Sequence, residues 1–516
     1  MENISKNFIG EFSASIRAMV LRAFPEEQQP VTLANPSLHA EIRLNSAMGF
    51  AVVGDVLPWR NRLARSAVNR KVGGSSPPGS GSGVCFCNLA DYQSHRFFSS
   101  KKDAEKLLPE IYGLLLSVKN ARNGQSVILP TNNVCNEIID NVVIVCSDVP
   151  EGDLLTITNS SLTLANLHLY KLLNRNAQTL EVELGEHGTE PNSAGSLLWE
   201  LPCCEFDGMW ENLVFDDSIK EELLSYVYAL VKLSEKSADS SVLRVNRLIL
   251  LHGPPGTGKT SLCKALAQKL SIRFSQKYKS IYFVEINSHS LFSKFFSESG
   301  KLIQNMFRQI EELAEDSKAF VFVLIDEIES LTIARGALLS RNEPTDAIRA
   351  VNAVLTQVDH IRRRNNIFIF TTSNIIQSLD EAFTDRTDLS RLVGYPSADA
   401  IYTIFSSCIQ EMQRIGVVQP DPWFSKRYAN DRHCEKLMQL SRRASGLSGR
   451  CLRQLPVIGY SKLPADQLSI DQCLDVLEKA VEEKLTESMR YKQSVSNVRQ
   501  GIASNTAGFL TDWLRP

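Results

Sequence analysis

The feature that most constrains this chain is a glycine-rich turn at residues 253–260, with the sequence Gly-Pro-Pro-Gly-Thr-Gly-Lys-Thr. It follows an apolar run, Leu248–Leu251, and leads into a helical pattern, Ser261–Leu270. A strand, such a turn and a helix in this order form a phosphate-binding loop. The glycines let backbone N–H groups surround phosphates, and the helix N-terminus adds a partial positive charge. The sequence therefore predicts an α/β domain that binds a nucleotide.

The residues of this turn suit ATP with Mg²⁺. The Lys259 ammonium can reach the β- and γ-phosphates, and the Thr260 hydroxyl can ligate the metal. We therefore expect ATP and Mg²⁺ as cofactors. The residues predicted to bind the nucleotide are Gly253, Pro254, Pro255, Gly256, Thr257, Gly258, Lys259, Thr260 and Ser261.

A second motif follows further along the chain, where the apolar run Val321–Ile325 ends in Asp326 and Glu327. An aspartate at the carboxyl end of a parallel strand lies beside the metal of the nucleotide, so Asp326 joins Thr260 as a predicted Mg²⁺ ligand. An adjacent acid can orient and polarise water, which a hydrolase needs and a small-molecule kinase does not. Glu327 is therefore predicted to be catalytic, in a hydrolysis reaction.

Three polar residues complete the predicted catalytic set. Asn374 ends the buried strand pattern that begins at Phe368 and could hold the attacking water or the γ-phosphate. Arg450 opens a helix and could contact phosphate within its own chain. Arg386 could act as an arginine finger on the nucleotide of a neighbouring subunit, or it could form a surface salt bridge.

The fold class is predicted from the alternation of strand and helix patterns after residue 206. Continuous apolar runs such as Ile281–Ile286 and Ile367–Phe370 are typical of buried parallel strands. Beyond residue 396 helical patterns dominate, and the last begins at Ser469, which can form a capping box with Gln472. We expect an α/β protein with a parallel-sheet ATPase core and a C-terminal helical lid, preceded by a small α+β N-terminal domain.

The N-terminal domain is predicted from a helix at Pro109–Val118 and strands at Val142–Cys146, Leu154–Thr158 and Leu180–Leu184. Residues 59–83 combine basic side chains with a Gly/Ser/Pro run, and no aromatic residues are interleaved with the charges. A flexible insertion is therefore favoured over a nucleic-acid patch. The expected segments are a flexible arm (1–30), the N-terminal domain with a disordered insertion near 59–83 (31–186), a linker (187–205), the ATPase domain (206–395), the helical region (396–494) and a flexible tail (495–516). The family resemblance given below implies that the N-terminal domain binds substrate or adaptor and that the helical region is the lid of the ATPase.

Composition narrows the choice of partners. The chain of 516 residues has 56 basic and 58 acidic side chains, so net charge gives no reason to expect nucleic acid or an anionic membrane. Its apolar runs are far shorter than the ~20 residues that span a bilayer. The eleven cysteines include no C-x-x-C pair, which argues against a zinc or thioredoxin-like site and favours reduced thiols.

The order of these motifs resembles that of AAA+ ATPases over residues 206–484. Within that superfamily the chain is similar to the pachytene checkpoint protein 2 family, also called thyroid hormone receptor interactor 13. The segments that carry this similarity are Leu251–Leu270, Glu285–Lys294, Phe296–Lys301, Asp346–Arg349, Val351–Gln357 and Gly446–Arg450, with Leu201–Trp210 resembling the family's junction into the ATPase domain.

The resemblance implies a homo-hexameric ATPase that partially unfolds HORMA-domain proteins, often through a HORMA-like adaptor. It implies roles in the disassembly of spindle-checkpoint complexes and in the control of meiotic chromosome axes and recombination. The implied location is the nucleus and cytoplasm, with chromosomes in meiosis. The family's pore loop carries an aromatic gripping residue, commonly Trp, and Phe295 stands at the matching position; a residue of the following helix's core is the alternative for Phe295.

Other classes of function remain open on the sequence alone. A DNA clamp loader or replication initiator shares the ATPase core but needs a basic DNA-binding module, which only residues 59–83 suggest. A membrane-bound AAA protease needs a zinc-binding H-E-x-x-H, and the sequence contains none. The HORMA client and the balance between mitotic and meiotic roles stay undetermined.

Overall fold

In the computed structural model, the chain forms two compact units, Met1–Leu172 and Leu173–Pro516, which we describe separately. Among the residues described, no helix is long and apolar enough to cross a membrane. The predicted arm, insertion, tail and pore residue Phe295 lie outside the described residues. These described residues are 38–44, 108–127, 139–146, 152–158, 167–180, 196–236, 242–243, 245–287, 299–329, 345–376, 379, 381–420 and 432–490.

The second unit contains a seven-stranded sheet with the strand order β12-β8-β11-β10-β9-β7-β6. The five strands from β12 to β9 are parallel, and β7 and β6 join antiparallel. The four strands predicted after residue 206 are confirmed as β8, β9, β10 and β11. The bounds are β6 Gln178–Thr179, β7 Ser196–Leu201, β8 Leu248–His252, β9 Ser280–Asn287, β10 Ala319–Asp326, β11 Ile367–Ser373 and β12 Leu389–Leu392.

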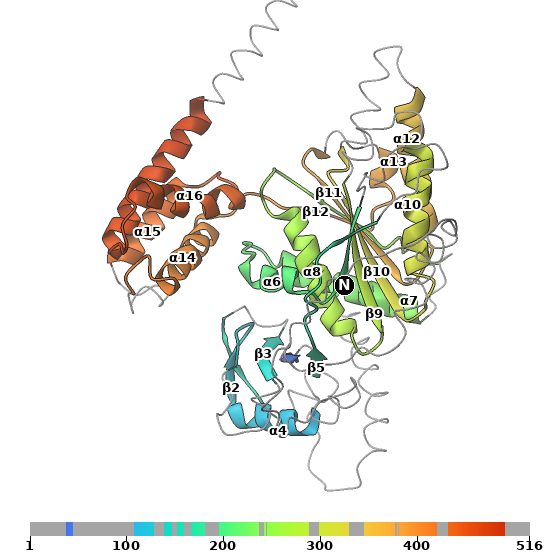
Figure 1. Cartoon of the computed structure of the whole chain (residues 1–516), viewed down its shortest axis with the longest axis horizontal. Helices are drawn as coiled ribbons and strands as arrows, with labels where there is room; N and C mark the ends of the chain where they lie inside the picture. Colours follow the sequence, from blue (N-terminus) through green and yellow to red (C-terminus); the bar gives the residue numbers. More distant parts are fainter. Residues whose placement is uncertain are drawn as a thin grey trace, which may run out of the picture. The chain divides into compact units, whose positions relative to one another are not determined.

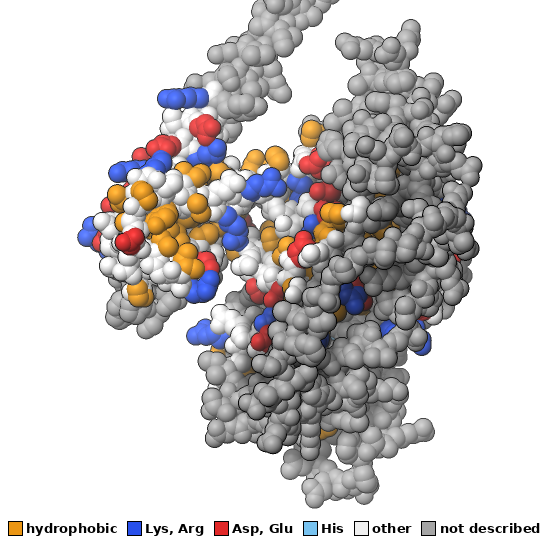
Figure 2. All heavy atoms as spheres, in the orientation of Figure 1, with side chains coloured by type: hydrophobic (Ala, Val, Ile, Leu, Met, Phe, Trp, Pro, Cys, Tyr) orange, Lys and Arg blue, Asp and Glu red, His pale blue; other side chains and the backbone are white. Residues whose placement is uncertain are grey.

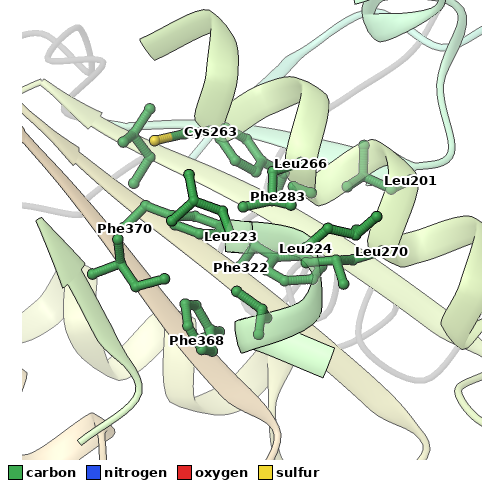
Figure 3. Close-up of a cluster of buried hydrophobic side chains, with 14 of the residues drawn as sticks. Leu201, Leu223, Leu224, Cys263, Leu266, Leu270, Phe283, Phe322, Phe368 and Phe370 are labelled. Carbon is green, nitrogen blue, oxygen red and sulfur yellow. The ribbon is translucent and has the colours of Figure 1, made fainter. Parts of the chain in front are cut away.

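Helices cover both faces of this sheet (Figure 1). Along β10, Phe320 and Phe322 pack into a core with α7 and α8, whereas Val321 and Val323 pack into a core with α10 and α12. Figure 3 shows the first core, where phenylalanines of β9, β10 and β11 lie against leucines of α7 and α8. Both faces are therefore apolar, which explains the continuous apolar runs in the sequence. The helices are α7 Ile219–Glu235, α8 Lys259–Phe274, α10 Ser299–Leu313, α12 Thr345–Ile361 and the short α13 Glu381–Thr384.

The segment that precedes the ATPase motifs packs against this core. Strand β7 lies within residues 187–205, which the sequence suggested as a linker. It pairs antiparallel with β9 at the edge of the parallel strands. The Trp199 ring lies 5.9 Å from that of Phe283 and 5.3 Å from that of Phe206, measured between centroids. Gln268 of α8 bonds both the N–H and the carbonyl of Cys203, at 3.1 and 2.9 Å. A short 3-10 helix, η2 (Cys204–Phe206), and α6 (Met209–Asn212) follow.

A helical lid follows the sheet. Its helices are α14 Ala398–Arg414, α15 Arg432–Arg443, α16 Gly449–Lys462 and a helix at residues 470–490, packed around one apolar core. The predicted capping box is confirmed, because the Ser469 N–H donates to Gln472 Oε1 at 2.9 Å and the Gln472 N–H donates to Ser469 Oγ. Figure 2 shows hydrophobic, basic and acidic side chains mixed on the lid surface.

The first unit is a small α+β domain. Strand β1 (Leu38–Leu44) pairs antiparallel with β3 (Ile139–Cys146) and parallel with β5 (Leu167–Tyr170). Helix α4 (Leu108–Val118) packs on the sheet through Ile111 and Leu115. The predicted helix and the first two predicted strands are confirmed, the second as β4 (Leu154–Thr156), which pairs with β2 (Asn120–Arg122).

Candidate functional site

The nine residues predicted to bind nucleotide form the turn between β8 and the start of α8. Lys259 is buried at the first position of α8. Its ammonium donates hydrogen bonds to the Gly253 carbonyl at 2.7 Å, the Pro254 carbonyl at 2.8 Å and Asn374 Oδ1 at 2.9 Å. The turn therefore encloses a cationic group at the N-terminus of a helix, an arrangement that attracts phosphate oxygens.

Two glycines of the turn leave no space for a side chain. Gly253 has φ 143°, and a Cβ there would lie 2.3 Å from the Val393 carbonyl oxygen. Gly256 has φ 76°, and a Cβ there would lie 2.9 Å from Ser448 Oγ of the lid. Because both positions combine positive φ with close contacts, only glycine fits there without displacing Val393 or Ser448.

The two predicted metal ligands come together from different elements. Thr260 of α8 donates from its hydroxyl to Asp326 Oδ1 of β10 at 2.9 Å. The parallel strands bring the end of β10 beside the turn, as the sequence motif requires. Among the described residues no group of three or more His, Cys, Asp or Glu side chains could hold a metal. Two protein oxygens fit Mg²⁺, which commonly takes its other ligands from phosphates and water.

Glu327 follows directly after β10 and has φ 54°, a left-handed conformation that is rare outside glycine. Its N–H donates to Thr372 Oγ1 at 3.0 Å, and the Asn374 side-chain amide lies 3.5 Å from its Oε1. Asn374 therefore lies between the Lys259 ammonium and the Glu327 carboxylate. This position suits a group that orients a water or a phosphate oxygen between them.

Two residues that we did not predict complete this network. Thr372 of β11 donates from its hydroxyl to Asp326 Oδ1. Glu329 is buried and accepts from the Asn374 N–H at 3.0 Å. Polar residues at the ends of two adjacent parallel strands were the available signal, but the register of β10 against β11 was needed to pair them.

Burial lowers the pKa of the Lys259 ammonium, and the carboxylates of Glu329, Asp326 and Glu327 act in the opposite direction. The Arg450 guanidinium adds to the lowering, which places its positive charge near Lys259. Three acidic groups and the Arg450 guanidinium thus act electrostatically on the Lys259 ammonium at the carboxyl end of the sheet. A polyanion with a divalent cation matches such a mixed site.

The lid reaches the turn through the start of α16. The Arg450 N–H donates to the Gly256 carbonyl at 3.0 Å, and Ser448 caps α16 by accepting from the Cys451 N–H. The backbone of Arg450 therefore contacts the nucleotide turn, and the predicted contact of its side chain with phosphate stays a prediction. A movement of the lid would displace the turn through this backbone hydrogen bond.

Arg386 does not join this site. It forms a two-pronged ion pair with Asp359, with Nε at 3.0 Å and 3.2 Å from the two carboxylate oxygens and Nη2 at 3.0 Å from Oδ2. That carboxylate raises the pKa of the Arg386 guanidinium. Its neighbour Asp388 bonds Leu248 at the amino end of β8, about 15 Å from the nucleotide turn by the length of that strand. Arg386 is therefore remote from the phosphates of its own chain.

Comparisons with known proteins agree with this geometry. The chain matches three family models: the ATPase family associated with various cellular activities (AAA) over residues 249–395, the Pch2 N-terminal domain over 97–172, and the TRIP13-like AAA+ ATPase lid C-terminal domain over 423–485. These matches cover the nucleotide turn, the α+β unit and the lid, and they confirm the predicted fold class.

Two relatives and one solved structure illustrate the similarity of the whole chain to known proteins. A putative pachytene checkpoint protein 2 of Caenorhabditis elegans is 45% identical over 401 residues, which are 75% of this chain and 94% of the relative. The human pachytene checkpoint protein 2 homolog is 44% identical over 360 residues, 68% of this chain and 82% of the relative. The solved structure of C. elegans PCH-2 has a TM-score of 0.66 at 39% identity, and the match covers 88% of this chain and 100% of that one.

The match to the AAA family supports nucleotide binding, typically with Mg²⁺, and ATPase activity for this chain. The resemblance found in the sequence motifs is confirmed by these relatives. The chain therefore belongs to the pachytene checkpoint protein 2 family of AAA ATPases.

Proposed function

We propose that this protein is a homo-hexameric ATPase that uses ATP hydrolysis to unfold part of a HORMA-domain protein. The observation that carries the hydrolytic part is the meeting of Lys259, Asp326, Glu327 and Asn374 at the carboxyl end of the sheet. The remodelling part rests on membership of the family. The proposed setting is the disassembly of spindle-checkpoint complexes and the control of meiotic chromosome axes, in the nucleus and cytoplasm and on meiotic chromosomes.

In this proposal each residue of the site has a defined task. Lys259 and the N–H groups of the turn bind the phosphates, and Asn374 holds the attacking water against the γ-phosphate. Glu327 orients and polarises that water and accepts its proton. Thr260 and Asp326 would hold Mg²⁺, which when bound neutralises charge on the phosphates. Arg450 couples the lid to the same phosphates.

The test is capture of the substrate by an ATP-trapped enzyme. Glu327→Gln keeps the phosphate-binding groups but removes the proton acceptor, so ATP stays bound while turnover falls by about 100-fold or more. This variant with ATP should retain a HORMA-domain protein on a pulldown, and wild type with ATP should convert that protein from its closed to its open form. Rapid hydrolysis by Glu327→Gln, or no conversion by wild type, would reject the proposal.

Arg386 is proposed to act across a subunit boundary, because it lies at the opposite end of β8 from its own nucleotide turn. An Arg386→Ala chain and a Glu327→Gln chain are each expected to be inactive. Mixed assemblies contain interfaces with an intact Glu327 facing an intact Arg386, so hydrolysis should partly return. Absence of recovery in proven mixed assemblies would leave the Asp359 ion pair as the role of Arg386.

Phe295 is proposed to grip the substrate in the central pore through ring contacts, which tolerate many sequences. Phe295→Ala is expected to keep the fold and basal ATPase while HORMA conversion falls sharply. Phe295→Trp, which supplies a larger ring, should retain HORMA conversion and the ATPase stimulation that substrate causes. A markedly lower melting temperature of Phe295→Ala would indicate a core residue instead.

A DNA clamp loader or initiator is the alternative function. It predicts salt-dependent retention of DNA by the full chain, whereas the proposed remodeller predicts retention of HORMA-domain proteins, possibly through a HORMA-like adaptor. Direct comparison of the two ligands on the same preparation separates these functions. Family membership favours the remodeller.

A further inference from the structure

Thr372 of β11 contacts three consecutive residues at the end of β10. Its hydroxyl donates to Asp326 Oδ1 and accepts from the Glu327 N–H at 3.0 Å. Its carbonyl accepts from the Ile328 N–H at 2.9 Å. The side chain of Thr372 is 1% exposed, so water does not compete for these hydrogen bonds.

These hydrogen bonds lie beside a residue with an unfavourable backbone conformation. Glu327 has φ 54°, and a left-handed conformation at a residue with a side chain persists only where its surroundings fix it. Asp326 Oδ1 also accepts from the Thr260 hydroxyl at 2.9 Å, so the Asp326 carboxylate connects α8 to β10. The Thr372 hydroxyl thus bonds both the Asp326 carboxylate and the Glu327 backbone.

We propose that Thr372 is a positioning residue for ATP hydrolysis. Its hydroxyl keeps the Asp326 carboxylate turned toward Thr260 and holds the backbone from which the Glu327 side chain projects. The inference rests on the proposed hydrolytic role of Glu327 and deepens it. Thr372 acts through these two acidic residues.

The next residue along the chain provides a matched control. Thr371 is fully buried, and its hydroxyl donates to the Ile249 carbonyl of β8 at 3.0 Å. Adjacent residues of a strand face opposite sides of the sheet. Thr371→Val thus removes a buried hydroxyl and one hydrogen bond from the same strand without altering the bonds to Asp326 or Glu327.

The experiment measures ATP affinity with a fluorescent ATP analogue, the single-turnover rate of hydrolysis, and the melting temperature, all on the full chain. Thr372→Val should lower the hydrolysis rate by about tenfold or more, because a small displacement of reacting groups has an effect of this size. Its ATP affinity should stay within about twofold of wild type. Thr372→Ser, which retains the hydroxyl, should recover most of the rate, and Thr371→Val should hydrolyse ATP at the wild-type rate.

Several results would overturn the inference. These are a wild-type rate for Thr372→Val, an equal loss in Thr371→Val, or no recovery in Thr372→Ser, which would make the methyl group the important part. If Thr372→Val does not fold, Thr372→Ala provides the same test against Thr372→Ser. Glu327→Gln is measured in parallel: if it hydrolyses ATP normally, the proposed function fails, whereas a slow Glu327→Gln beside a fast Thr372→Val rejects only the role of Thr372.

Discussion

The two ends of the ATPase sheet each contain a residue held in the left-handed conformation, Glu327 at the carboxyl end and Arg247 at the amino end. Their side chains differ in what they contact. Arg247 is buried and donates to the Arg362 carbonyl at 2.9 Å, to Asn365 Oδ1 at 2.8 Å and to Ser234 Oγ at 2.7 and 3.0 Å. Glu327 is held through its N–H, and its carboxylate lies 3.5 Å from the Asn374 amide.

This contrast separates a structural polar network from the network that we propose to be catalytic. At the amino end, the strained backbone serves to bring a guanidinium onto fixed protein acceptors, and burial lowers the pKa of Arg247. At the carboxyl end, hydrogen bonds fix the backbone and leave the acid beside an ammonium and an amide. We therefore propose that a similar backbone conformation contributes stability at Arg247 and positions the proposed catalytic acid at Glu327.

The largest effect is expected at the carboxyl end. Lys259→Ala removes the ammonium that we propose to bind the phosphates, so ATP affinity should fall by about 100-fold, the range for charge-assisted hydrogen bonds. Lys264→Ala is the control on the same helix, since Lys264 pairs with Glu285 at 2.8 Å and should leave affinity within about twofold. Titration with a fluorescent ATP analogue measures both, and equal losses would contradict the assignment of Lys259.

At the amino end, Arg247→Ala should destabilise the fold by about 2–4 kcal/mol, because buried acceptors lose their donor. Hydrolysis per folded molecule should be unchanged at low temperature. Arg247→Gly should be more stable than Arg247→Ala by about 1 kcal/mol, since glycine tolerates positive φ. Denaturant unfolding measures these differences, with Arg414→Ala, which removes an exposed ion pair with Glu411, as a control expected to leave stability close to that of wild type. Loss of ATP affinity in Arg247→Ala would show that the two ends are not separable.

The smallest effect is expected for Asp388→Asn. The carboxylate accepts from the Asn246 N–H at 2.9 and 3.1 Å and from the Leu248 N–H at 3.3 Å. Asparagine keeps one acceptor oxygen, so the loss of stability should be about 1 kcal/mol, with ATP affinity and turnover unchanged. A melting curve and an ATPase assay on one preparation check this; a stability loss as large as that of Arg247→Ala would indicate that charge organises the amino end.

The features that could be predicted from the sequence are those formed by residues close together in the chain. The nucleotide turn, the acidic pair after β10 and the capping box at Ser469 each lie within a few residues, so local pattern and spacing predict them. The links of Thr372 to Asp326 and of Arg386 to Asp359 join distant segments. Predicting such links needs the order and register of the strands, and strand register is set by packing that no short segment contains.

The place of β7 in the sheet bears on how this protein can be divided for expression. A fragment that begins at Phe206, where the sequence predicted the ATPase domain to begin, would lack β7 with Trp199 and would leave the outer edge of β9 without a partner. An uncovered edge strand pairs readily with other chains and promotes aggregation. A fragment that begins at Leu173, the first residue of the second compact unit, retains β6, β7 and the Cys203 contact with Gln268. Solubility of the isolated ATPase portion is thus decided by residues that precede all of its catalytic motifs.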